Sequence, residues 1–75
     1  MPDIVEYHIA RLSDKNPEVR LKSVRELGLI GGDSALAALE AVFRTESDVA
    51  VKHAIQEAGR AIYRRHKENE AGSGV

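Results

Sequence analysis

Cysteine is absent from this chain of 75 residues, and aromatic residues and prolines are scarce. Without cysteine the chain can form neither a disulfide nor a thiolate metal site. Its aromatic residues, Tyr7, Phe43 and Tyr63, are too few for a platform on which successive nucleic-acid bases stack. The prolines are Pro2 and Pro17, and β-branched residues never alternate as they would in a half-buried strand. These absences favour an all-α protein.

An excess of one charge is also lacking, since eleven Lys and Arg residues face twelve Asp and Glu residues. Nucleic-acid-binding proteins usually carry a clear basic excess, so this balance argues against nucleic acid as the main partner. The first twelve residues interleave Asp3, Glu6 and Arg11 with apolar residues. They contain neither the apolar core of a signal peptide nor a membrane-spanning run. We therefore expect a cytoplasmic protein with no membrane contact.

Apolar residues recur at spacings of three and four in four segments, which predicts four helices before residue 66. The first helix is expected to run from Pro2 to Leu12, because proline is well tolerated at a helix start. The second should begin with an Asn16 N-cap and Pro17, and end at Gly31 and Gly32. The remaining predicted N-caps are Asp33 for the third helix and Ser47 for the fourth.

The periodicity also predicts which side chains face inward, and where the folded domain ends. The polar run after residue 65 is expected to form a disordered tail over residues 66–75. In helix order, the predicted inward residues are Ile4, Val5, His8, Ile9 and Leu12; Val19, Ser23, Leu27 and Ile30, with Val24 flanking this face; Ala35, Leu36, Leu39, Val42 and Phe43; and Ala50, Val51, Ala54, Ala58, Ala61 and Ile62.

The two halves of the chain repeat each other. An offset of 31 aligns the following pairs: Leu12 with Phe43, Ser23 with Ala54, Val24 with Ile55, Glu26 with Glu57, Leu27 with Ala58, and Gly28 with Gly59. An offset of 32 aligns three more pairs: Asp14 with Glu46, Val19 with Val51, and Arg20 with Lys52. One inserted residue between Thr45 and Val49 reconciles the two registers. The repeat predicts one domain over residues 1–65, built from helix–turn–helix units at about residues 2–32 and 33–65.

The run from Asp14 to Arg20, followed by Ser23, Leu27 and Gly28, resembles the HEAT-repeat pattern. The Gly32-Asp33-Ser34 junction and the short repeat resemble the HEAT-like repeats of phycobilin-lyase-type proteins. The resemblance implies an all-α fold of two stacked helical hairpins, a fragment of an α-α superhelix. It also implies a ladder of hydrogen bonds along the stack, made here by Asp14, Arg20, Glu46 and Lys52.

In such stacks the second helix of each unit lines a concave binding surface. The resemblance therefore assigns a candidate protein interface to the outward faces of the second and fourth helices. Exposed leucines and a tyrosine among basic residues suit an interface, although a solvated face with stray leucines is the alternative. The predicted interface residues are Leu21, Lys22, Arg25, Leu29, Lys52, His53, Gln56, Arg60 and Tyr63.

The function expected from this surface is that of a small adaptor or accessory subunit that binds another protein or a larger complex. Two stacked units bury little surface, and Ala37, Ala38 and Ala41 offer a further packing face. We therefore expect the chain either to self-associate or to dock onto a larger partner that completes the stack. The phycobilin-lyase resemblance suggests a narrower role in cofactor attachment or assembly. The alternative is a module that grips nucleic-acid backbone through the basic cluster Arg60, Arg64, Arg65 and Lys67.

Catalytic and metal sites find no support in the sequence. It contains no glycine-rich phosphate loop and no serine nucleophile motif. His53 and Glu57 have a spacing that metal ligands on a helix can adopt, but only His66 is a further histidine in that half. His8 is expected to be a packed, hydrogen-bonded side chain. The sequence therefore predicts neither an enzyme nor a metal site, and it implies no cofactor.

Overall fold

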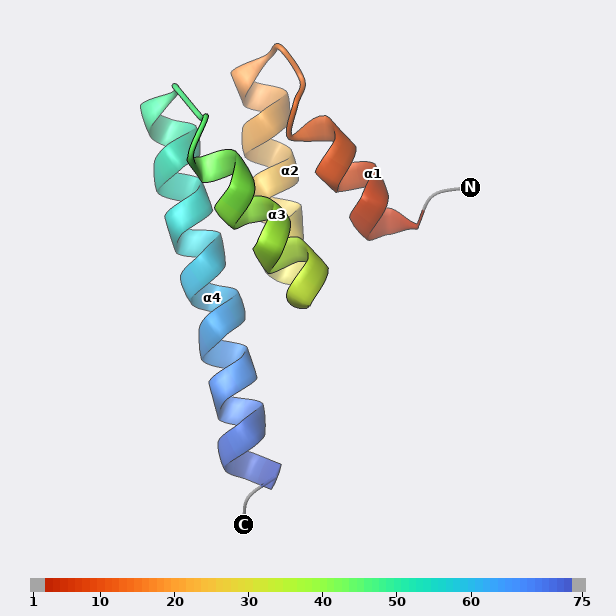
Figure 1. Ribbon diagram of the computed structural model, residues 1–75, viewed down its shortest axis with the longest axis vertical. Coiled ribbons are helices and arrows are strands. Elements are labelled where there is room, and N and C mark those ends of the chain that lie inside the picture. The colour runs from red at the N-terminus through yellow and green to blue at the C-terminus, as the bar shows by residue number, and fades with distance from the viewer. Residues whose placement is uncertain (1–2, 74–75) are drawn as a thin grey trace.

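The computed structural model describes residues 3–73, with side chains for residues 3–68. Over this range the chain forms four α-helices and no β-strand (Figure 1). They are α1 (Ile4–Arg11), α2 (Pro17–Ile30), α3 (Asp33–Phe43) and α4 (Val49–Ser73). The predicted all-α fold of two helical hairpins is confirmed.

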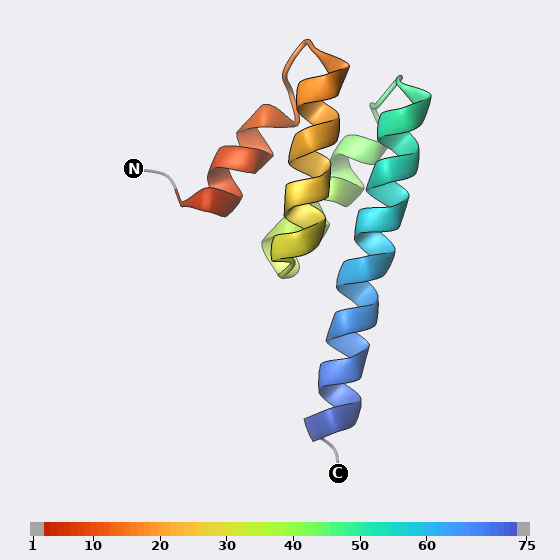
Figure 2. The same cartoon turned by 180° about the vertical axis from the view of Figure 1, so that it is seen from behind.

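The second helices of the two hairpins form the centre of the molecule. α2 and α4 lie side by side, run in the same direction and make the most extensive contact between two helices (Figure 1). Seen from behind, they form one layer with α3 on its far side (Figure 2). α1 packs against α2 at one edge and also contacts α3. The second hairpin is thus stacked on the first.

The limits of α2 follow the sequence signals closely. Asn16 caps the helix by accepting a hydrogen bond from the backbone N–H of Glu18 at 2.9 Å, and Pro17 is the first helical residue. Gly31 ends the helix with a φ of 76°, a conformation that side chains with a Cβ rarely adopt. The predicted start and end of this helix are both confirmed.

The other three helix starts differ from the prediction. α1 begins at Ile4 rather than Pro2, and Asp3 is its N-cap through the N–H of Glu6. Pro2 itself lies outside the described residues. Gly32, not Asp33, is the N-cap of α3, because the backbone needs a φ of 95° there.

The cap of α4 was also predicted wrongly. Asp48, not Ser47, caps α4, since the carboxylate oxygen Oδ1 of Asp48 accepts the N–H of Val51 at 3.0 Å. Both residues are good N-caps, so composition alone does not choose between them. The side chain of Glu46 holds the N–H of Asp48 at 3.0 Å and thereby fixes the turn before the helix.

One hydrophobic core joins all four helices. Its buried residues are Leu12, Val24, Leu27, Ala35, Leu39, Val51, Ile55, Ala58 and Ile62. Val5, Ile9, Leu36, Val42, Phe43 and Ala54 are partly buried against it, as predicted. Ile4, Ile30 and Ala50 were predicted to face inward but are exposed, with Ile4 at 60% and Ile30 at 38%. Helical periodicity gives a face, but it does not say whether another helix covers the face at that height.

α4 continues past the expected domain boundary. The backbone is helical to Ser73, where the sequence suggested a disordered tail from residue 66 onward. Residues 64–71 are mostly Arg, Lys, Glu and Ala, which favour helix even without packing. Residues 74 and 75 of the predicted tail lie outside the described residues.

Candidate functional site

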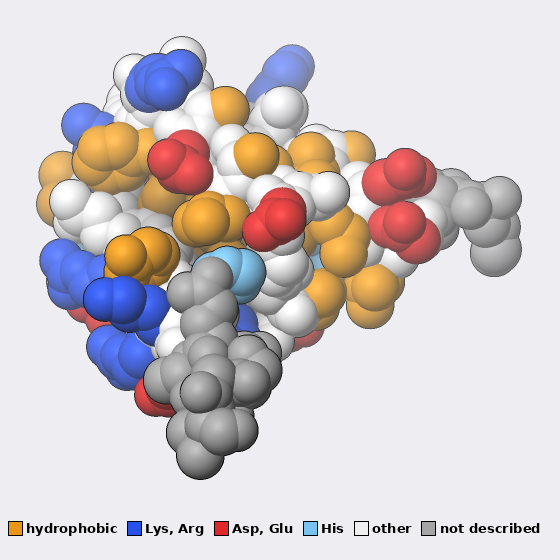
Figure 3. Space-filling view, turned by 60° about the horizontal axis from the view of Figure 1, so that its bottom comes forward, with side chains coloured by type: hydrophobic (Ala, Val, Ile, Leu, Met, Phe, Trp, Pro, Cys, Tyr) orange, Lys and Arg blue, Asp and Glu red, His pale blue; other side chains and the backbone are white. Residues whose placement is uncertain are grey.

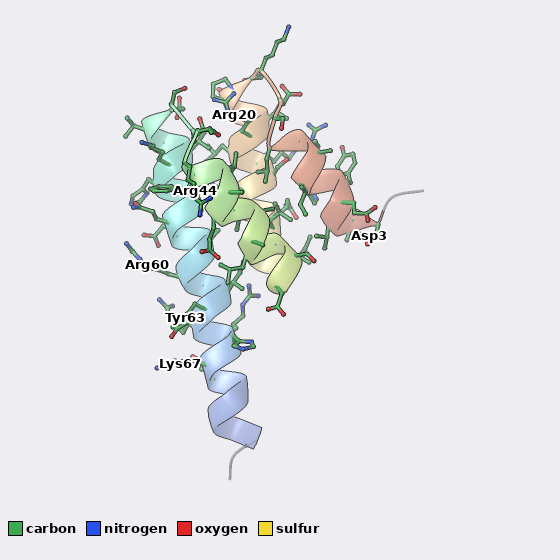
Figure 4. All side chains as sticks on the ribbon, viewed as in Figure 1. Asp3, Arg20, Arg44, Arg60, Tyr63 and Lys67 are labelled. Carbon is green, nitrogen blue, oxygen red and sulfur yellow. The ribbon has the colours of Figure 1, made fainter. Side chains whose placement is uncertain are left out.

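An ion pair joins the two hairpins at the end where both second helices begin. Arg20 on α2 donates from Nε to Oε1 of Glu46 and from Nη2 to Oε2, both at 2.9 Å. The Nη1 of Arg20 reaches the backbone oxygens of Asp14 at 2.8 Å and Lys15 at 3.1 Å. This fork ties the turn between α1 and α2 to the turn between α3 and α4. Arg20 is labelled at the top of α2 in Figure 4.

The Glu46 side chain is almost entirely removed from solvent, with 2% of its surface exposed. Hydrogen bonds from Arg20 hold the pKa of the Glu46 carboxyl below its usual range, against the opposing effect of burial. The same hydrogen bonds raise the pKa of Arg20. A buried carboxylate with a bidentate guanidinium partner is therefore a fixed part of the fold.

The four residues assigned to the ladder do not act alike. Arg20 and Glu46 are joined directly, and Asp14 takes part through its backbone oxygen. The carboxylate of Asp14 instead accepts the N–H of Asn16 at 2.9 Å. Lys52 lies apart, with its Nζ 5.7 Å from the centre of the Phe43 ring.

A shallow groove runs between α2 and α4. Four of the predicted interface residues, Leu21, Arg25, Leu29 and His53, line it. The other lining residues are Gly28, Ala50, Ala54, Glu57 and Ala58, so the floor consists mainly of small side chains. Leu29 stands at its rim with 71% of its surface exposed. The groove offers an apolar floor with an exposed leucine beside it.

Charged groups of both signs border this groove. Arg25 is exposed on the α2 side. On α4, Glu57 Oε1 lies 3.8 Å from His53 Nε2 and 3.2 Å from Arg60 Nη1. These exposed charges contribute little to the stability of the fold. Their signs would instead favour binding partners of complementary charge.

A second groove lies on the other side of α4, between α4 and α3. It contains three further predicted interface residues, Gln56, Arg60 and Tyr63. The remaining lining residues are Leu36, Leu39, Glu40, Phe43, Arg44, Ile55 and Gly59. Figure 4 shows Arg60 and Tyr63 pointing away from α2. Lys22 and Lys52 are exposed and line neither groove.

The nine predicted residues therefore do not share one surface. At 100° per residue, His53 and Glu57 turn toward α2, while Gln56, Gly59 and Tyr63 turn toward α3. A helical wheel separates these stripes. It does not show which stripe faces the neighbouring second helix, because that depends on how the hairpins stack.

Comparison with known families gives a match over most of the chain. The model for HEAT repeats matches residues 1–59. The chain belongs to the HEAT-repeat family. HEAT repeats generally form protein-interaction modules. No curated protein and no solved structure matches the chain. The likeness to phycobilin-lyase-type repeats is not confirmed by this match and stays a prediction.

In HEAT terms, α2 and α4 are the second helices of consecutive repeats, and their groove crosses the junction between the repeats. Gly28 makes this junction close, since a Cβ built there would come within 2.8 Å of the Ala58 Cβ. Small residues at the contact bring the two helix backbones together. Because the two helices lie so close together, the groove between them is shallow.

One residue with a structural role was missed in the sequence. Arg65 on α4 donates to the backbone oxygens of Leu29, at 2.7 Å, and of Gly28. Its Nε also donates to Ala61 O within its own helix, at 3.3 Å. The guanidinium thus caps the last carbonyls of α2 and links the two HEAT repeats a second time. No local signal reveals this contact, because the partners are 36 and 37 residues apart.

The histidines do not assemble a metal site. Among the described residues, no group of three or more His, Asp or Glu side chains is placed to hold a metal ion. His8 is half-buried on α1, and its Nδ1 is buried without the hydrogen bond predicted for this ring. Within residues 3–73 that the structure describes, no helix is both long and apolar enough to cross a membrane.

Proposed function

We propose that this HEAT-repeat chain is an adaptor or accessory subunit that binds a segment of another protein in the groove between α2 and α4. The observation that carries the proposal is the exposed Leu29 beside the apolar groove floor, at the junction of the two repeats. Covering an exposed leucine is worth about 1.5–3 kcal/mol, so a partner that buries it gains affinity.

The charges around the groove indicate the chemistry of the segment. Arg25 on α2 favours a carboxylate, and Glu57 on α4 favours a basic group. The occupant that fits is a short helix or extended segment with an apolar residue against Leu29. An acidic side chain would lie toward α2 and a basic one toward α4. Such a pattern gives specificity more than affinity.

A matched pair of variants tests this function. Arg25→Glu/Leu29→Glu reverses one charge and removes one exposed apolar residue in the groove. Lys15→Glu/Val49→Glu makes the same changes at exposed positions that line neither groove; Val49 is 81% exposed. In affinity capture from source cells, we expect one partner to be retained by wild type and by the control pair. The groove pair should lose it while keeping its helical circular dichroism.

The contact itself is tested with a photo-crosslinking residue in place of Leu29 or, for comparison, of Tyr63. We expect crosslinks to the captured partner from position 29 and far fewer from position 63. Equal crosslinking from both positions, or capture that survives Arg25→Glu/Leu29→Glu, would contradict the α2–α4 groove as the binding face.

Nucleic-acid backbone binding has weaker support. Of the basic cluster proposed for it, Arg65 is engaged by the carbonyls of α2, and Arg60 is paired with Glu57. Salt-dependent binding to generic duplex DNA is the measurement that would favour this alternative.

A further inference from the structure

The internal repeat makes the two ends of the stack comparable with its centre. Arg20 in the first repeat corresponds to Lys52 in the second at an offset of 32. Arg20 reaches across the repeat junction to Glu46. Among the described side chains, Lys52 has no carboxylate within ion-pair distance. Within the described part of the chain, Lys52 of the second repeat is therefore an unpaired cation at the position where Arg20 of the first repeat binds Glu46 of the next repeat.

The glycines show the same correspondence. Gly28, which packs on Ala58, corresponds to Gly59 at an offset of 31. A Cβ built on Gly59 would meet only Leu36 Cδ1, at 3.9 Å. Gly59 lies in the α3–α4 groove beside the partly buried Phe43 and the exposed Tyr63. In the described structure, the α3–α4 side of the second repeat is thus an uncovered apolar surface, at the position where the first repeat packs against its neighbour.

At the opposite end of the stack, the outer side of α1 carries residues that correspond to those with which the second repeat contacts the first. Asp14 corresponds to Glu46 at an offset of 32, and its side chain is exposed. Ile4 corresponds to Ala35 at an offset of 31. Ala35 is fully buried at the junction, whereas Ile4 is 60% exposed and its neighbour Tyr7 is 49% exposed. The outer edge of α1 therefore exposes Ile4 and Tyr7, with the Arg11 guanidinium 5.3 Å from the centre of the Tyr7 ring.

The charges of the two edges are complementary. Basic side chains gather at the left edge in Figure 3 and acidic ones at the right-hand tip, and both lie beside hydrophobic side chains. Figure 4 places Arg60 and Lys67 on the outer side of α4, and Asp3 at the far end of α1. Arg44 and Lys52 belong to the basic edge, which also holds Glu40, and Glu6 belongs to the acidic edge, which also holds Arg11.

We propose that the chain associates head to tail with a second copy of itself, the α1 edge of one copy packing on the α3–α4 edge of the next. Lys52 of one copy pairs with Asp14 of the other, in the place of the Arg20–Glu46 pair. Ile4 and Tyr7 cover the apolar groove around Phe43 and Tyr63. The contact joins two different surfaces, so it leaves one free edge of each kind and extends to longer assemblies. It leaves the α2–α4 groove uncovered and does not depend on the proposed function.

Sedimentation velocity across micromolar to millimolar concentrations tests the association. We expect the weight-average mass of the wild type to rise with concentration, and to rise less at high salt because salt screens the charged edges. A wild type that stays monomeric at every concentration would overturn the proposal.

Two edge variants decide between head-to-tail and symmetric contacts. Lys52→Glu/Arg60→Glu alters only the basic edge, and Ile4→Ser/Tyr7→Ser removes only the apolar cover of the α1 edge, so the two altered edges do not attract each other by charge. Each variant alone should remain monomeric, whereas an equimolar mixture should form a heterodimer and no larger species. A mixture that stays monomeric, or a variant that self-associates as strongly as wild type, would overturn the arrangement. Circular dichroism confirms that each variant is folded.

A charge exchange tests the named pair. Lys52→Asp alone and Asp14→Lys alone should each weaken self-association about tenfold or more, the range measured for close charge pairs at interfaces. The double variant Lys52→Asp/Asp14→Lys restores opposite charges between copies and should recover most of the loss. Failure of the double variant to recover would overturn the pairing, even if the chain still associates.

Discussion

Gly28 on α2 lies so close to Ala58 on α4 that a Cβ added to Gly28 would meet the Ala58 Cβ at 2.8 Å and its Cα at 3.2 Å. The neighbouring atoms are a backbone Cα and a Cβ that cannot rotate away. The two helices of the HEAT-repeat junction would have to move apart to admit a methyl group. The two repeats can therefore stack this closely only with glycine at position 28.

Replacing Gly28 with alanine should destabilise the protein. Overpacking of this kind costs about 1–3 kcal/mol, more than the roughly 1 kcal/mol that alanine gains over glycine in a helix. Gly59→Ala is the matched control, because its nearest side-chain neighbour is 3.9 Å away. We expect Gly59→Ala to raise stability by about 0.5–1 kcal/mol. Urea unfolding measures both, and equal effects would contradict the close contact at Gly28.

Two leucines on α2 should respond very differently to truncation. Leu27 is fully buried in the core, whereas Leu29 is 71% exposed. Leu27→Ala should cost about 2–5 kcal/mol, enough to unfold much of a domain this small. Leu29→Ala should change stability by less than about 0.5 kcal/mol. Thermal unfolding checks the pair, and a large loss for Leu29→Ala would show that its side chain is structural.

Stability should fall in acid because of Glu46. Hydrogen bonds from Arg20 lower its folded pKa, so the unfolded chain binds a proton at higher pH than the folded one does. The contribution of Glu46 is therefore complete above its ordinary pKa of about 4.3 and is lost as the pH falls from there through the lowered folded value.

Glu46→Gln removes this contribution. The variant should be less stable at neutral pH and should lose less further stability between about pH 5 and pH 2. Glu40→Gln, at an exposed carboxylate, serves as the control. Urea midpoints measured against pH compare the three proteins. Parallel curves for wild type and Glu46→Gln would mean that the Arg20–Glu46 pair does not couple folding to protonation.

Arg65 should stabilise the end of α2 through its bonds to the Leu29 and Gly28 oxygens. Arg65→Met keeps most of the side-chain volume but removes the donors, and we expect a loss of about 1–2 kcal/mol. Arg64→Met removes the same charge from the exposed neighbouring position and should cost much less. Hydrogen exchange at the last turn of α2 should rise only in Arg65→Met, and unchanged exchange there would contradict the cap.

Several features could be predicted because they depend on nearby residues. Asn16, Pro17 and Gly31 mark the limits of α2, since capping involves groups within a few positions of each other. The internal repeat predicted the two hairpins. The HEAT resemblance brought Arg20 and Glu46 together as members of one set, and the structure joins them directly.

Other features were missed because they depend on which helices meet. The predicted interface residues on α4 divide between two grooves. Ile30 stays 38% exposed, because it lines an open pocket between the end of α2 and residues of α3 and α4. The role of Arg65 arises only when the end of α2 comes beside the later turns of α4. The residues adjacent in sequence predict neither the division between the grooves nor the role of Arg65.

The sequence by itself determined the helices, the repeat and the apolar face of each helix, because these follow from hydrogen bonds and periodicity within a few residues. Only the tertiary structure decided how α2 and α4 approach, and hence which side chains line a groove, cap a helix or remain exposed. The close packing of Gly28 on Ala58 is one part of that approach. Such contacts join residues 30 or more positions apart, where a local pattern carries no information about distance or rotation.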